Sequence, residues 1–207
     1  MMQIIVQGLL LSGLYALIAM GFMLIFSIGR TLNLAYGAYI MVGGYIYFWL
    51  SQQLGMPKIV GFAGAVMVGA LMGFLKHRLI VKPLKGDAVA VEISTLILAI
   101  IMQSVMVLVF GDASKILLPI IPGVVTVAGA QLTYNILAAT VMSWIIIAAL
   151  YAFVRGTHTG RAMQAVSMDE KGAAISGVDP DKINMITWAI SGALGAAGGV
   201  FFASYTQ

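Results

Sequence analysis

Residues 155–182 read RGTHTGRAMQAVSMDEKGAAISGVDPDK, which is the longest polar interval in a chain that is 61% hydrophobic and only 9% charged. Within it, Ser167 and Glu170 have the spacing of a capping box, in which the two side chains satisfy free amides at a helix start. Gly177 suits the positive φ of a helix C-terminal cap. The spacing therefore predicts a helix of about two turns over residues 168–176.

The same interval ends where another helix is expected to begin. Asp179 and Pro180 are residue types preferred at the N-cap and the first position of a helix, and an apolar run follows them. A short capped helix between two apolar runs is either a well-ordered loop or a docking element for a soluble partner. We favour the docking element, because a simple connection between membrane spans has little need of a capped helix of mixed charge.

Composition assigns the chain to a class. Its 207 residues include 24 glycines and 14 methionines in an apolar majority, which is outside the range of soluble domains. We predict an all-α polytopic membrane protein with a single transmembrane domain over residues 1–207, embedded in a lipid bilayer. The net charge of +4 is not a nucleic-acid signal, because the bases lie beside apolar runs, as the positive-inside rule expects. The lack of cysteine excludes a disulfide framework and a thiolate metal site.

Six apolar runs have the length of transmembrane helices, about 17–25 residues. They cover residues 4–26, 34–50, 59–75, 93–110, 135–154 and 183–205. Four bases mark each of two loops as cytoplasmic: Lys76, Arg78, Lys82 and Lys85 in one, and Arg155, Arg161, Lys171 and Lys182 in the other. This orientation places residues 111–134 and the N-terminus outside. If the glycine-interrupted second run re-enters instead of crossing, the N-terminus lies in the cytoplasm.

Small residues recur at intervals of four in two of the runs. Such ridges let another helix approach closely in a membrane. They consist of Gly61, Ala65, Gly69 and Gly73 in the third run, and of Ser191, Gly195, Gly199 and Ala203 in the sixth. Both ridges predict helix packing and not chemistry.

Polar residues within the runs predict a solute pathway. No Asp, Glu, Lys, Arg or His is expected in the interior of a span, which argues against proton-driven transport. Gln103 is predicted to face the bundle interior, because an unpaired amide in lipid is costly. The second run resembles a broken helix that lines a cavity, and it adds Asn33, Tyr36, Tyr39 and Gly43 to the predicted pathway.

Chemical motifs are missing from the sequence. It contains no G-x-x-x-x-G-K-[ST] phosphate loop and no Ser/His/Asp or H-E-x-x-H pattern. We therefore expect no catalytic residue, no metal ligand and no cofactor in this chain. Any transport against a gradient then needs energy from another subunit.

Four stretches carry a resemblance to a known family. They are TLNLAYGAYIMVGGY (31–45), KPLKGDAVAVEISTLILAI (82–100), GRAMQAVSMDEKGAAISGVDPDKI (160–183) and SGALGAAGGVF (191–201). In this order they resemble the permease subunits of bacterial ABC importers for branched-chain amino acids. The resemblance implies a subunit of the bacterial inner membrane that works with a second permease, two cytoplasmic ATPases that bind ATP, and a periplasmic solute-binding protein.

The resemblance also implies a function for the polar interval. Residues 160–178 become the loop that couples the permease to its ATPase. The residues implied at that contact are Arg161, Asp169, Glu170, Ala173, Ala174 and Gly177. The small alanines would let the short helix seat in a groove, while the charges would set its orientation.

Two departures from the family pattern keep alternatives open. The family usually has Asn-Phe-Ala-His-Gly-Glu where this chain has Asn33, Leu34, Ala35, Tyr36, Gly37 and Ala38. A permease for urea or short amides is therefore an alternative to one for amino acids. The family normally continues through further spans after the equivalent of Gln207, so a truncated, non-transporting bundle is the second alternative.

The cysteine-free chain allows a direct test of the orientation. We expect a His158→Cys variant to resist an impermeant thiol reagent added outside intact cells and to react after permeabilisation. Asp112→Cys, in the predicted external loop, serves as the control that reacts from outside. External labelling at position 158 would reverse the topology.

Overall fold

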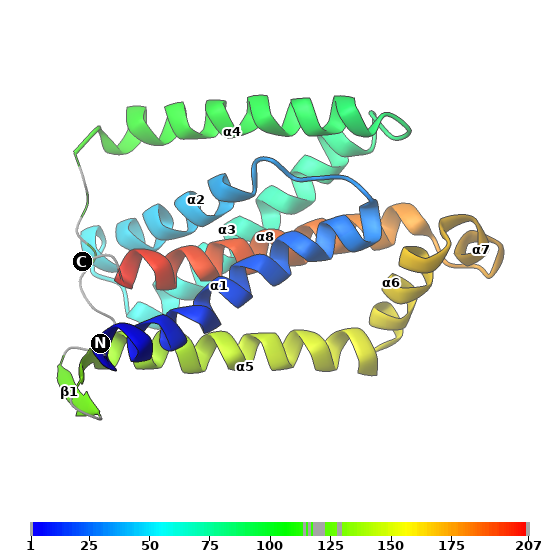
Figure 1. Ribbon diagram of the computed structural model, residues 1–207. Coiled ribbons are helices and arrows are strands. Elements are labelled where there is room, and N and C mark those ends of the chain that lie inside the picture. The colour runs from blue at the N-terminus through cyan, green and yellow to red at the C-terminus, as the bar shows by residue number, and fades with distance from the viewer. Residues whose placement is uncertain (1, 114, 116, 118–122, 128–129, 206–207) are drawn as a thin grey trace.

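The computed structural model describes residues 2–113, 115, 117, 123–127 and 130–205. Among these residues, five helices are long and apolar enough to span a membrane: α1 (Met2–Gly29), α3 (Lys58–Lys76) with its π-helical extension η2 (His77–Val81), α4 (Ala88–Phe110), α5 (Tyr134–Gly156) and α8 (Pro180–Tyr205). They run side by side along the bundle (Figure 1). The predicted all-α polytopic membrane fold is therefore confirmed.

The second predicted span is shorter than expected. The helix α2 (Tyr36–Phe48) has 13 residues and is about 20 Å long, and the π-helical turn η1 (Trp49–Gln53) follows it. Residues 30–35, between α1 and α2, form no helix. In Figure 1 this stretch and α2 together run back along the bundle from the end near α7 towards the end that holds both termini. The arrangement favours a crossing over a re-entrant loop.

The central helix is α8. The small-residue ridge of α3 packs against it, and the ridge of α8 itself packs against α2. Gly69 and Gly73 of α3 meet the backbone of Gly192 and Trp188, and a Cβ atom on either glycine would collide with a carbonyl oxygen. On another side, Gly199 of α8 lies against the backbone of Ile40 in α2. The predicted role of the ridges in helix packing is confirmed.

The helix α4 lies at the rim of the bundle. Only 6% of its most apolar window is buried, against 67% for α8, and its buried residues are Val91 and Thr95 near its start. Gln103 is exposed, so the prediction that it faces the interior is wrong. The physical reason is that the middle of α4 touches little of this chain and has no interior to face.

The polar interval forms two helices where one was predicted. The helix α6 (His158–Met168) includes Ser167, whose hydroxyl donates to the Gln164 carbonyl at 2.7 Å. The helix α7 (Glu170–Ile175) is capped by Asp169, whose Oδ1 accepts the Lys171 amide at 3.0 Å. The predicted Ser167–Glu170 capping box is therefore wrong, because Asp169 is closer to the free amides.

The two caps predicted after α7 are confirmed. Gly177 has φ +86° and donates its amide to the Ala174 carbonyl, as a helix C-terminal cap requires. Asp179 Oδ1 accepts the amides of Asp181 and Lys182 at 3.0 and 3.2 Å at the start of α8.

A small hairpin lies in the predicted external loop. Its strands β1 (Val124–Val127) and β2 (Ala130–Thr133) are antiparallel, with Val124 opposite Thr133. The strand β2 leads directly into α5. The hairpin lies at the end of the bundle where α1 begins, opposite α6 and α7 (Figure 1).

Close packing of α3 on α8 yields a stability prediction. Gly73→Ala places a Cβ against the Trp188 carbonyl, and such overpacking typically costs about 1–3 kcal/mol. Gly8→Ala is the matched control, because no described residue has an atom within 4 Å of a Cβ at that helical glycine. We expect a lower melting temperature in detergent for Gly73→Ala alone, and equal melting temperatures for both variants would contradict the packing.

Candidate functional site

A buried polar cluster lies at the break between α1 and α2. Asn33 is buried there, and its Oδ1 accepts the Ala35 amide at 3.2 Å and the Lys76 ammonium. Unpaired backbone groups are costly at membrane depth, and α4 satisfies two of them. The Leu32 amide donates to a Glu92 carboxylate oxygen at 3.2 Å, and the Leu34 amide donates to the Thr95 hydroxyl at 3.0 Å.

Lys76 is a residue that the sequence interpretation misplaced. It was predicted as a loop base, whereas the structure makes it the last residue of α3, with 3% of its surface exposed. Its neighbour His77 is also buried, in η2. The prediction that spans lack ionisable residues is therefore wrong, because the helix continues through Val81. A signal was available, since Lys76 lies three residues after Gly73 and so shares the face of the ridge.

Two aromatic rings enclose the Lys76 ammonium. Its Nζ lies 5.2 Å from the Tyr39 ring centroid and 5.3 Å from that of Trp188, within the range of cation–π attraction. In the described part of the chain, no carboxylate oxygen lies within 4.0 Å of Lys76 Nζ. The charge is thus held by a neutral amide and two rings.

The structure gathers three of the five predicted pathway residues. Tyr36 and Tyr39 are buried beside Asn33, and their ring centroids are 6.0 Å apart. The Tyr36 ring also contacts Phe22 of α1, with centroids 5.8 Å apart. Among the described residues the Tyr36 hydroxyl has no hydrogen-bond partner, so the cluster contains a buried hydroxyl whose hydrogen bonds are not satisfied.

The other two predicted pathway residues lie elsewhere. A Cβ at Gly43 would collide with the Ala196 backbone of α8, so this glycine serves close packing and does not line a path. Gln103 is exposed on α4, away from the cluster. Neither supports a pathway role in this arrangement.

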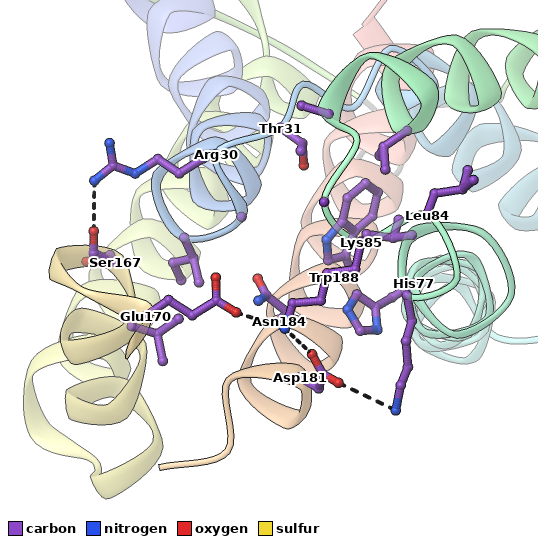
Figure 2. Close-up of a pocket in the computed structure, with 18 of the residues that line it drawn as sticks. Arg30, Thr31, His77, Leu84, Lys85, Ser167, Glu170, Asp181, Asn184 and Trp188 are labelled. Carbon is purple, nitrogen blue, oxygen red and sulfur yellow. Dashed lines mark hydrogen bonds and ion pairs between the residues drawn. The ribbon is translucent and has the colours of Figure 1, made fainter. Parts of the chain in front are cut away.

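A cavity of about 390 Å³ opens at the end of the bundle that carries α6 and α7. Its lining includes Arg30, His77, Asn184 and Trp188, together with residues of the η2–α4 loop (Figure 2). His77 Nδ1 and Asn184 Oδ1 have no hydrogen-bond partner among the described residues. Trp188 borders both this cavity and the buried ammonium, whose Nζ lies 5.3 Å from its ring centroid.

An ion-pair cluster fixes one side of the cavity. Lys85 Nζ lies 2.7 Å from Asp181 Oδ1 and 2.8 Å from Glu170 Oε1, as the dashed lines in Figure 2 show. The hydrogen bonds to Asp181 and Glu170 raise the pKa of Lys85 above its usual value. On the other side, Arg30 donates to the Ser167 carbonyl at 3.1 Å. These contacts attach α6 and α7 to α1, to α8 and to the η2–α4 loop.

We call residues 158–175 the α6–α7 unit, and its surface differs from the implied coupling contact. Ala173 is buried against Ile28, Ile183 and apolar residues of α6, so it is not on a surface that a partner can reach. One carboxylate oxygen of Glu170 pairs with Lys85. The remaining implied residues are exposed: Arg161, Asp169, Ala174 and Gly177.

Two apolar side chains that the sequence interpretation missed project from this unit. Met168 is 84% exposed at the end of α6, and Ile175 is 89% exposed at the end of α7. The sequence could have revealed them, because Met168 and Ile175 are apolar residues near the two ends of a short polar stretch that was predicted to be a capped helix. We call these two exposed side chains, each at the end of a short helix, the apolar tip.

Comparison with known proteins identifies the family. The family described as "Branched-chain amino acid transport system / permease component" matches residues 4–207. The high-affinity branched-chain amino acid transport system permease protein LivH of Escherichia coli is 27% identical over 218 residues, covering 99% of this chain and 71% of that protein. The corresponding protein BraD of Pseudomonas aeruginosa is 26% identical over 213 residues, covering 96% and 69%.

A more distant organism has a similar protein. The probable branched-chain amino acid transport permease protein LivH of Methanocaldococcus jannaschii is 27% identical over 208 residues, covering 96% of this chain and 65% of that protein. No solved structure matches the chain. The match over nearly the whole sequence, on a bundle of helices able to span a membrane, shows that this chain belongs to the branched-chain amino acid transport permease family and is a multi-pass transport subunit.

Proposed function

We propose that this chain is the permease subunit of an ABC importer that carries branched-chain or similar small amino acids inward across the bacterial inner membrane. The observation that carries the proposal is the apolar tip of Met168 and Ile175 on the α6–α7 unit. The apolar tip belongs to a sequence interval that carries four bases and is expected to face the cytoplasm, so it is suited to a soluble partner. That partner is a cytoplasmic ATPase.

The mounting of the α6–α7 unit supports transmission of force. Ala173 packs in a cluster with Ile28 at the end of α1 and Ile183 at the start of α8. Polar contacts add to this cluster, because Arg30 of the α1–α2 break donates to the Ser167 carbonyl. A push on the tip therefore reaches α1, α8 and the break between α1 and α2, instead of being absorbed in a loose loop.

The proposal divides the labour between subunits. The sequence contains no G-x-x-x-x-G-K-[ST] phosphate loop, which supports assigning ATP binding and hydrolysis to the ATPase subunits, and the proposal assigns no cofactor to this chain. A second permease completes the pathway, and a periplasmic binding protein delivers the solute. Closure of the ATPases moves the α6–α7 units, which exposes the break alternately to the two sides of the membrane.

Uptake by the reconstituted complex tests the proposal. The permease is reconstituted in proteoliposomes that contain ATP, together with the second permease and the ATPases encoded by neighbouring genes. The binding protein is added outside. We expect accumulation of radiolabelled leucine that requires internal ATP and external binding protein. A complex whose ATPase lacks its phosphate-loop lysine is the control without uptake. Uptake of urea without leucine, or ATP-driven export, would overturn the proposal.

Docking at the apolar tip gives a second prediction. Ile175→Asp places a charge where the ATPase is expected to exclude water, so leucine-stimulated ATP hydrolysis should fall at least tenfold and the ATPase should no longer co-purify. The abundance of the chain should not change, because Ile175 contacts little of its own protein. Val124→Asp, at an exposed apolar residue in the hairpin, is the matched control. Unchanged coupling in Ile175→Asp would place the contact elsewhere.

A further inference from the structure

We propose that the break between α1 and α2 holds a carboxylate-binding site in which the Lys76 ammonium is the counter-ion. The ligand is the carboxylate of the transported amino acid, so the inference rests on the function proposed above and extends it to one atom group of the solute. Nothing in the family match assigns a role to this lysine.

The first argument is the uncompensated charge. Lys76 is almost fully buried, and within the described residues its one oxygen acceptor is the neutral amide of Asn33. Buried ammonium groups are normally paired with an anion. The nearby carboxylates have other partners, because Glu92 accepts the Leu32 amide and Asp181 pairs with Lys85 and Lys82. A carboxylate that arrives with a ligand would supply this counter-ion.

The second argument is the broken helix. A helix start carries a partial positive charge, and the short helices of transporters often direct such ends at the anionic group of a substrate. The helix α2 starts at Tyr36, three residues after Asn33. Asn33 Oδ1 accepts both the Ala35 amide at the start of α2 and the Lys76 ammonium, so the fields of the helix start and of the ammonium both favour an anion at this acceptor position.

The surroundings suit a small amino acid more than an inorganic anion. The rings of Phe22 and Tyr36 adjoin the cluster and offer an apolar surface to an aliphatic side chain. The Tyr36 hydroxyl is buried against Gly21 of α1 and has no hydrogen-bond partner in the described part of the chain. Trp188 lines the 390 Å³ cavity and its ring centroid lies 5.3 Å from Lys76 Nζ, so we expect a ligand to pass this ring on its way from the cavity to the site.

Trp188 supplies a direct reporter of binding. The chain has three tryptophans, so Trp49→Phe and Trp144→Phe leave Trp188 as the sole source of indole emission. The full chain in lipid nanodiscs is titrated with leucine, with 4-methylpentanoate, which has a carboxylate but no amine, and with leucinamide, which lacks the carboxylate. We expect saturable emission changes with the first two probes and at least a tenfold weaker response with leucinamide.

Two substitutions assign the response to Lys76. Lys76→Met should weaken the response to leucine at least tenfold, whereas Arg78→Met, which removes a positive charge from an exposed position nearby, should leave it unchanged. Asn33→Asp places a carboxylate of the same shape against the ammonium. We expect this variant to melt at a higher temperature and to lose the response, which keeps the test decisive even where Lys76→Met fails to fold.

The outcomes separate this site from the proposed function. A leucine response that persists in Asn33→Asp, an equal response to leucinamide, or no saturable response in the tryptophan-reduced parent would each overturn the carboxylate site. If the complex takes up leucine and one of these results is found, the site alone fails. If the carboxylate response depends on Lys76 but the complex transports no amino acid, the anion site stands and the proposed function fails.

Discussion

Backbone contact of α8 with α2 and with α3 is the constraint on which the rest of the structure depends. In a membrane, helix association relies on close packing and not on a hydrophobic force, so small residues decide which helices meet. Gly69 and Gly73 of α3 reach the α8 backbone, and Gly199 of α8 reaches the α2 backbone. This contact fixes the rotation of α3, and the residue one turn after Gly73 must then face inward. The burial of Lys76 is a consequence of the glycine ridge.

The buried ammonium and the broken backbone form one electrostatic system. The break leaves amides that need acceptors, and α4 provides them through Glu92 and Thr95. Asn33 links the two parts, because a single oxygen accepts from the backbone and from Lys76. A change at the break therefore alters the partners of α4 and of α3 together.

The sequence predicted features whose causes are local and missed those decided by distant parts of the chain. The Asp179 cap, the positive φ of Gly177 and both glycine ridges were predictable because a few neighbouring residues determine them. Lys76 was assigned to a loop because charge marks loops, whereas packing on α8 extends the helix. Gln103 was assigned to an interior that α4 does not possess. Of the candidate site, Asn33, Tyr36 and Tyr39 were found through the glycine-interrupted run, but their lysine partner was not.

The contrast between α4 and α8 has a consequence for sequence divergence. The helix α4 is the most apolar of the five spans and the least buried, while α8 is the least apolar and the most buried. Tolerance to substitution should therefore run opposite to hydropathy. Outside its first two turns, α4 can drift among apolar residues with little effect, whereas α8 is restricted by shape at nearly every turn. In this fold the helix with the highest hydropathy should tolerate the most substitutions among apolar residues.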